Sequence, residues 1–297
     1  ALNEHRLNLR HKDNRNGLPQ MFNGGETDLR AIGAHNRHEN VSRYQEGGTG
    51  LLLYGQLIDQ YDVEGSGRDE LGLGRWSYMR FKGADGIETV ILSGYNPCAN
   101  SKVESNTVYQ QHRRFYVRKQ RDITCPRQRF RQDLVALLTK WREDGARLIV
   151  CLDANEDIYK KALGRALTDA DDLNMRDEVV GHYTHQPLGA TYFRGSKPIN
   201  GVWATSDVEI ANACVMPVGY GVGDHRLFVV DFVATSMVGT APPKIVRPPL
   251  RRLNTRIGSS AANYNAHLEC NIQRHRLIEK VEALEQSDEP EPIQKMK

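Results

Sequence analysis

The stretch from residue 89 to residue 152 constrains the fold most, because its apolar periodicity changes twice. Thr89–Tyr95 and Arg147–Leu152 are short runs of apolar and β-branched residues, which are typical of buried strands. Between them, Arg127–Asp144 repeats apolar residues at helical spacing and is followed by Gly145, a helix stop signal. A strand, a helix and a strand in this order predict a layered α/β fold.

Further strands are predicted on both sides of this unit. Two segments read as loops instead: Ala1–Glu46 is polar and aperiodic, with room for one helix, and Glu64–Gly74 is rich in glycine. The predicted strands are Leu51–Leu57, Trp76–Phe81, Val202–Ala204 and Leu227–Phe232.

The character of the sequence changes after Val233. We therefore predict one α/β domain over residues 1–235, a proline- and arginine-rich linker over 236–258, and an amphipathic helix with an acidic tail over 259–297. Apolar residues such as Leu268 and Ile278 mark one stripe of this helix, which we expect to pack on a neighbouring part of a longer protein.

Composition narrows the setting without choosing a function. The 297 residues carry 40 Lys and Arg against 37 Asp and Glu, so a mildly basic net charge of +3 permits nucleic-acid binding without requiring it. The five cysteines are widely spread and form no CxxC pair, which favours a reducing intracellular location, nuclear or cytoplasmic. No apolar run approaches the ~20 residues that span a bilayer, so we expect no membrane partner.

Acidic, amide and imidazole groups lie at the ends of predicted strands. Asp153 and Asn155 end one strand at positions i and i+2, while Asp224 and His225 come just before another, and Glu4 lies near the start. Such groups can bind a hard cation, polarise a water and hold a phosphoryl oxygen. Each pair alone is equally typical of a capped turn or a surface loop, and a lone Glu is usually solvated.

The order of these groups resembles the endonuclease/exonuclease/phosphatase superfamily, in particular its retrotransposon-type endonucleases, which are related to abasic-site nucleases. Asn3-Glu4 is similar to the QE motif of that family, and Tyr95 in the run GYNPC is similar to its YxPN tyrosine. Asp153 and Asn155 resemble its GDFN motif.

The resemblance continues in the second half of the chain. Thr191–Phe193 followed by Pro198–Thr205 resembles the run that ends in the IDYVL-type strand, and Gly223–Arg226 resembles the SDHR motif. Five short motifs in this order form a more specific signal than any one of them.

The resemblance implies a fold and a mechanism. The fold would be a four-layer α/β sandwich with two mixed sheets flanked by helices. The reaction would be single-step phosphodiester hydrolysis with Mg²⁺, or alternatively Mn²⁺, held by Glu4 and Asp224. His225 would act as base or phosphate contact and Asp153 would orient the attacking water, while Tyr95 and Asn155 would hold non-bridging oxygens.

The sequence departs from the family pattern in two places. Asn200 stands where the family strand carries the Asp that orients the histidine, so we expect impaired catalysis unless Asn200 is a tolerated variant. The family places a strand, a helix and a second strand before the QE motif, and this segment is missing ahead of Glu4. We therefore expect the domain to be truncated at its N-terminus by two core strands and to fold poorly in isolation.

Two other groups of residues have a composition that could form a site. The basic stretch Gln110–Arg131 contains Arg113, Arg114, Arg118 and Lys119, which we interpret as phosphate-backbone contacts, with a solvated helix face as the alternative. The spacing of His5, His11, His35 and His38 matches no metal-ligand pattern, so we expect solvated loop histidines.

The sequence is compatible with three functions. The first is a Mg²⁺-dependent endonuclease domain of a retroelement-like reading frame, which nicks DNA and precedes a reverse transcriptase domain. The second is a catalytically inactive nucleic-acid-binding remnant, which Asn200 favours. The third is an inositol-phosphate or lipid phosphoesterase of the same superfamily.

Overall fold

The computed structural model describes residues 1–11, 29–39, 44–83, 85–100, 102–120, 125–168, 173, 175–182, 188–221, 223–239 and 258–285. The chain divides into two compact units, Ala1–Lys244 and Ile245–Lys297. The first unit contains all the sheets, and the second contains helices α7 (Gly258–Arg274) and α8 (Leu277–Glu285).

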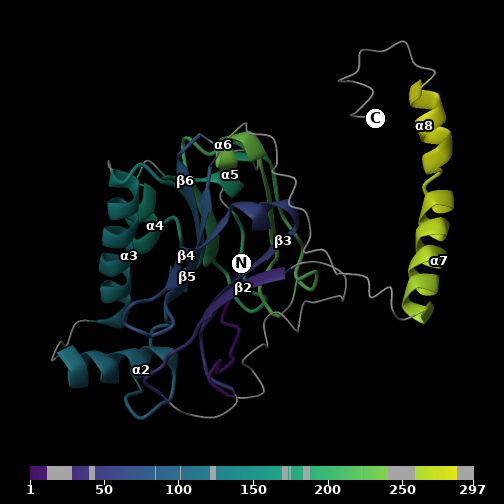
Figure 1. The fold of residues 1–297 in the computed structure, drawn as a ribbon. Helices are drawn as coiled ribbons and strands as arrows, with labels where there is room; N and C mark the ends of the chain where they lie inside the picture. The colour runs from purple at the N-terminus through teal and green to yellow at the C-terminus, as the bar shows by residue number, and fades with distance from the viewer. Residues whose placement is uncertain are drawn as a thin grey trace. The chain divides into compact units, whose positions relative to one another are not determined.

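A six-stranded sheet forms the centre of the first unit (Figure 1). Neighbouring strands are antiparallel except for one central pair, which is parallel and makes the sheet mixed. The strands are, in spatial order, β4 (Tyr61–Arg68), β5 (Trp76–Lys82), β6 (Glu88–Tyr95), β7 (Arg147–Asp153), β9 (Asn200–Thr205) and β8 (Met175–Asp177).

The predicted strand–helix–strand unit is confirmed. β6 and β7 are the parallel pair, with Thr89 opposite Arg147, and helix α3 (Pro126–Glu143) connects them on one face of the sheet. Pro126 occupies the first turn of α3, where its missing N–H costs nothing, and Gly145 takes a positive φ of 83° after the helix ends.

Helices α3 and α4 (Ala162–Thr168) cover this face of the sheet (Figure 1). Phe130, Leu134 and Leu138 recur every four residues and are fully buried against the strands. From the strands, side chains such as Leu92 and Leu148 point into the same core and are 0 % exposed. Each fully buried leucine contributes on the order of 1.5–3 kcal/mol, so this face carries much of the stability.

Two small antiparallel sheets lie over the opposite face. One contains β1 (Leu2–Asn3), β3 (Thr49–Tyr54) and β2 (Leu29–Ala34) in that order, and the other contains β10 (Ile210–Val215) and β11 (Phe228–Phe232). Their apolar side chains share a second core with the central strands. The α/β class is confirmed; in the described residues this layer consists of two separate antiparallel sheets.

The remaining elements of the first unit are short. They are the 3₁₀ helix η2 (Gly55–Gln60), helices α2 (Val108–Phe115), α5 (Glu178–His182) and α6 (Ala234–Val238), and the π-helical segment η3 (Tyr116–Gln120). In the described part of the chain, no helix is both long and apolar enough to cross a membrane.

Two loop predictions were wrong. Residues 61–68 form β4, although residues 64–74 were predicted as a loop. The glycine at position 67 leaves room for a neighbouring side chain instead of forming a turn, since a Cβ there would lie 2.6 Å from the hydroxyl of Tyr78. The N-terminal segment contains β1 and β2, and its described residues contain no helix. In β2 only Ile32 and Ala34 of the alternating set are apolar and buried, so the signal was short and weak.

The C-terminal amphipathic segment was predicted as one helix and forms two. Arg276 adopts a positive φ of 47°, which ends the regular helical path between α7 and α8. The predicted linker, residues 236–258, lies mostly outside the described residues, although its first part continues α6.

Candidate active site

Three of the predicted site residues stand in one row across neighbouring strands. Tyr95 at the end of β6 is opposite Asp153 at the end of β7, and Asp153 is opposite Asn200 at the start of β9. Residues in register point to the same face of a sheet. Asp153 shares its face with Ile149, which belongs to the core beneath the small sheets, so the row opens toward that layer.

His225 joins the row through Asn200. The Nδ1 atom of His225 lies 2.8 Å from Oδ1 of Asn200, and an N–H at Nδ1 donates a hydrogen bond to that oxygen. This arrangement leaves Nε2 with the lone pair, the form that a general base needs. Burial lowers the pKa of His225, and the charge of Asp224 opposes this only in part. The neutral amide of Asn200 brings no further charge to hold a proton there.

The loop that carries Asp224 and His225 is fastened to two neighbouring segments. The N–H of Phe193 donates to the carbonyl of Asp224 at 2.9 Å, and the N–H of Arg226 donates to Thr191 at 2.8 Å. The guanidinium of Arg226 donates to the carbonyls of Met216 and Val215 at the end of β10. The two sequence motifs that contain these residues are therefore adjacent in the fold.

Glu4 reaches the site from the turn after β1. Its N–H donates to Gly48 at 2.7 Å and its φ is 58°, an uncommon conformation for a residue with a Cβ. Upstream of it, the Oγ of Ser93 on β6 donates to the carbonyl of Leu2 at 2.9 Å. The negative charge of Glu4 raises the pKa of both Tyr95 and Asp153, so its carboxylate lies within electrostatic range of the row.

Asp153 is the most perturbed carboxyl of the site. It is 2 % exposed, and burial raises its pKa to about 7, with further increases from the charges of Glu4 and Asp224. The N–H of Asn155 donates to its Oδ1 at 3.1 Å and offsets part of this shift. A carboxyl with a pKa near neutrality can exchange a proton with water at physiological pH.

A left-handed backbone places the side chain of Asn155. Its φ is 48°, its Nδ2 donates to the carbonyl of Asn96 at 2.8 Å, and its side chain favours the ionised form of Tyr95 enough to lower that pKa slightly. Burial raises the pKa of Tyr95, followed by the charges of Glu4 and Asp153, so its hydroxyl remains protonated and able to donate. Tyr95 and Asn155 thus form one hydrogen-bonding edge of the site.

Arg127 connects the loops that follow β6 and β7, a role that the sequence alone did not indicate. Its guanidinium donates to the carbonyls of Pro97 at 2.8 Å and Ala154 at 3.4 Å, and it pairs with Glu156. The sequence showed Arg127 only as one of many basic residues. Its position depends on where α3 begins relative to the two loops.

The four predicted basic residues differ in whether their charged groups bond within the protein or are exposed to solvent. Arg114 donates to Glu39 at 3.2 Å and to Ser105 and Asn106, so its guanidinium is committed within the protein. Arg113, Arg118 and Lys119 are exposed on α2 and η3, although Arg118 also lies 3.8 Å from Glu39. The exposed three remain a proposed nucleic-acid contact.

Of the four histidines expected in solvent, His35 is buried and His5 is half-buried. Loss of contact with water lowers the pKa of His5 and of His35 to about 4 each, so both are neutral at physiological pH. His5 lies 3.0 Å from the carbonyl of Ala34 and its Nδ1 accepts from Leu7. Spacing along the sequence could not reveal this, because the contact with Ala34 joins residues 29 positions apart.

The donor set of the site fits a hard divalent cation. Glu4 and Asp224 offer carboxylate oxygens. Burial raises the pKa of Glu4, Arg6 opposes this, and the charges of Glu46 and Asp224 add to it, so a bound cation would stabilise the ionised form. Mg²⁺ commonly uses one or two carboxylates together with water and substrate phosphate. Within the described ranges, no three His, Cys, Asp or Glu residues converge closely enough to enclose an ion by themselves.

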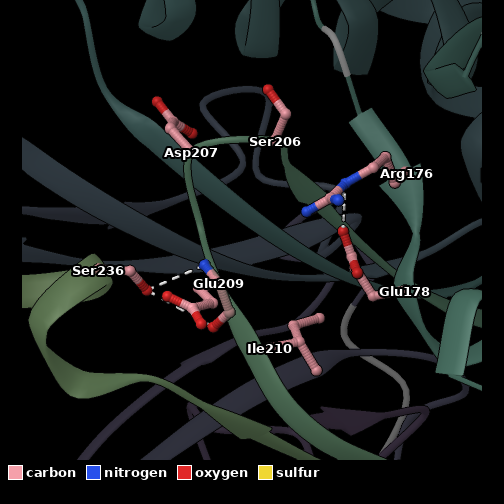
Figure 2. Close-up of a pocket in the computed structure, with 7 residues that line it drawn as sticks. All are labelled: Arg176, Glu178, Ser206, Asp207, Glu209, Ile210 and Ser236. Atoms are coloured by element: carbon pink, nitrogen blue, oxygen red, sulfur yellow. Dashed lines mark hydrogen bonds and ion pairs between the residues drawn. The ribbon is translucent and has the colours of Figure 1, made fainter.

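A separate cavity of about 420 Å³ lies near the opposite end of β9 (Figure 2). Asn200 begins β9 and Ser206 follows its end, so roughly 20 Å of extended strand separates the two places. Arg176 and Glu178 form an ion pair of 2.7 Å across this cavity. Its lining residues are Arg176, Glu178, Ser206, Asp207, Glu209, Ile210 and Ser236.

The chain is similar to several solved structures. It matches the human Nocturnin catalytic domain at 14 % identity over 78 % of this chain and 79 % of that chain, with a TM-score of 0.49. It also matches an AP endonuclease from Archaeoglobus fulgidus at 14 % identity over 77 % of this chain and 86 % of that chain, with a TM-score of 0.47.

A third match is a protein from Bacteroides vulgatus, at 14 % identity over 76 % of this chain and 81 % of that chain, with a TM-score of 0.46. That protein is an endonuclease/exonuclease/phosphatase. The motifs described above resemble the same superfamily. No protein-family model matches the sequence, and no curated protein matches it.

Proposed function

We propose that the chain is a divalent-cation-dependent phosphodiesterase of the endonuclease/exonuclease/phosphatase type, that it acts on nucleic acid, and that its reaction is the nicking of DNA. The observation that carries this proposal is the row of Tyr95, Asp153 and Asn200, with His225 bonded to Asn200. Acidic, amide, phenol and imidazole groups from separate parts of the chain meet there, as phosphoryl transfer requires.

The proposed division of labour starts from the roles that the resemblance to the superfamily implies. Asp153, with its pKa of about 7, accepts a proton from the attacking water. Tyr95 and Asn155 donate hydrogen bonds to non-bridging oxygens of the phosphate. His225, held at Nδ1 by Asn200, contacts the phosphate or acts as a base through Nε2. A Mg²⁺ or Mn²⁺ ion held by Glu4 and Asp224 would supply charge neutralisation at the phosphate and the leaving oxygen.

Nucleic acid is the proposed substrate because exposed cations lie on the helix that follows the Tyr95 strand. Arg113, Arg118 and Lys119 project from α2 and η3. Replacing all three by Gln should weaken DNA binding at every sequence and reduce the salt dependence of the binding constant by up to about three counterions. A retroelement origin with a downstream reverse transcriptase remains part of the proposal, on the strength of the motifs alone.

A second candidate function is a nucleic-acid-binding remnant without catalysis. Asn200 favours it, because the side chain beside His225 carries no charge that would stabilise the imidazolium ion. Salt-dependent DNA binding without cleavage would identify such a protein.

Nicking of supercoiled plasmid separates the two functions. We expect the chain to produce open circles with Mg²⁺ and none with EDTA, and we expect Asp224→Ala to abolish the reaction. An Asp231→Asn variant, which alters an exposed carboxylate on β11, should cleave like the unmodified chain. Absence of cleavage by the folded chain in Mg²⁺ and in Mn²⁺, with DNA binding retained, would replace the enzyme by the remnant.

A further inference from the structure

Arg6 lies beside the carboxylate that is proposed to hold the cation. Its guanidinium is 3.4 Å from Oε1 of Glu4 and 3.3 Å from Oε2 of Glu46. The two negative charges outweigh partial burial and raise the pKa of the Arg6 guanidinium, so it is charged at every relevant pH. Neither motif comparison nor residue spacing assigns a role to this residue.

The backbone fixes Arg6 in this place. The N–H groups of Glu4 and Arg6 donate to Gly48 and Gly47, at 2.7 and 3.0 Å, and both residues have positive φ values, 58° and 56°. Two non-glycine residues with positive φ so close together are uncommon, and this turn sets the Arg6 guanidinium against the carboxylates of Glu4 and Glu46.

The ring of His5, between these residues, holds the turn in position. It lies 3.0 Å from the carbonyl of Ala34, and its Nδ1 accepts from the N–H of Leu7 at 3.0 Å. A Cβ on Gly48 would lie 2.5 Å from Cε1 of His5, so the ring occupies a place that only glycine leaves open. The pairing of Arg6 with Glu4 therefore follows from the shape of the turn.

We propose that Arg6 is a resident positive charge that competes with the divalent cation for Glu4 and lowers the affinity of the site for that cation. This inference rests on the proposed metal role of Glu4 and Asp224. Arg6 neutralises Glu4 and Glu46 when no ion is bound, and a divalent ion must displace the guanidinium from Glu4 and tolerate a neighbouring positive charge.

The size of the effect follows from exposure. The side chain of Arg6 is 61 % exposed, and exposed ion pairs are weak because water and salt screen them. Removing the charge should therefore tighten cation binding about two- to fivefold, more at low ionic strength and less at 0.5 M salt.

Binding of Mn²⁺ alone to the full chain tests the proposal, measured by the loss of the electron paramagnetic resonance signal of free Mn²⁺. Arg6→Gln should bind Mn²⁺ about two- to fivefold more tightly than the unmodified chain, and Arg6→Lys, which keeps the charge, should bind with nearly unchanged affinity. Arg10→Gln is the matched control: Arg10 is exposed and donates to the carbonyl of Arg37. It should leave Mn²⁺ binding unchanged.

The outcomes distinguish the two proposals. Equal or weaker Mn²⁺ binding by Arg6→Gln, with Asp224→Ala still abolishing it, would overturn the role of Arg6 and leave the metal site intact. Unchanged Mn²⁺ binding in Asp224→Ala would overturn the proposed metal site itself. Tighter binding by Arg10→Gln, equal to that of Arg6→Gln, would show a general charge effect and contradict the specific role.

Discussion

The two faces of the central sheet are built in different ways from the same strands. On the face under α3 and α4, Leu92 and Val150 are 0 % exposed in an all-apolar core. On the other face of the same two strands, Ile91 and Cys151 are only partly buried, and the strands end in Tyr95 and Asp153.

This difference shows where stability and function are separated in the molecule. Alternation along a strand sends consecutive residues to opposite faces, so one β7 strand supplies Leu152 to the core and Asp153 to the site. The helix-covered face is closely packed and apolar. The other face contains a buried carboxyl group and a half-buried imidazole, and burial together with neighbouring charges displaces their pKa values.

The largest expected effect concerns the charge beside His225. Asn200→Asp should restore a carboxylate next to Nδ1 and raise the rate of plasmid nicking by at least tenfold. Replacing the Asp beside the histidine of a serine protease triad by Asn lowers kcat about 10⁴-fold, and this factor is the upper limit for the gain in nicking rate. Nicking rates of the two proteins at equal Mg²⁺ measure this directly.

The control for Asn200→Asp is the same Asn-to-Asp substitution on strand β10. Asn212→Asp adds one negative charge to an exposed position of β10 and should leave the nicking rate unchanged. An unchanged rate in Asn200→Asp would mean that Asn200 is a tolerated variant and that the impairment lies elsewhere.

Alanine substitutions at two neighbouring residues of β6 measure how much each face of the sheet contributes to the free energy of unfolding. Leu92→Ala should lower the free energy of unfolding by about 2–5 kcal/mol, because it leaves a cavity in the closely packed core. Ile91→Ala removes a similar volume from the partly buried face and should cost clearly less. Urea unfolding of both variants measures the difference, and equal losses would contradict the distinction between the faces.

The site face should also make stability depend on pH. The pKa of Asp153 is raised by burial from 3.8 to about 7, so the folded state binds its proton more tightly than the unfolded state does. Stability should therefore fall as the pH rises from about 4 to about 7, by up to roughly 4 kcal/mol. Asp153→Asn should abolish this loss in urea unfolding with EDTA present. An identical pH profile in the variant would contradict the raised pKa.

The sequence could predict the elements that have long apolar runs and the segments that carry the ordered motifs. The strands of Tyr95 and Asp153 and the helix between them have strong periodicity, and the fold brings their ends together as expected. The Asp224-His225 loop also lies where the motif order predicted, against Asn200.

Other features depend on contacts that no local pattern encodes. Strand β4 was hidden because Gly67 makes room for Tyr78 rather than for a turn. The burial of His5 and the position of Arg6 depend on a left-handed turn that β3 and Ala34 stabilise from a distance of about 30 residues. Spacing in the sequence carries no information on either.

The central claim is that the charges of Glu4 and Asp224, from two other segments of the chain, act on the carboxyl of Asp153 at one end of the sheet. The most direct test is the pKa of the Asp153 carboxyl, measured by ¹³C NMR titration of the chain without divalent cations. The value should be about 7 in the unmodified chain and should fall in both Glu4→Gln and Asp224→Asn, because each removes a nearby negative charge. A pKa that is the same in all three proteins would show that Glu4 and Asp224 do not reach Asp153, and would contradict the account.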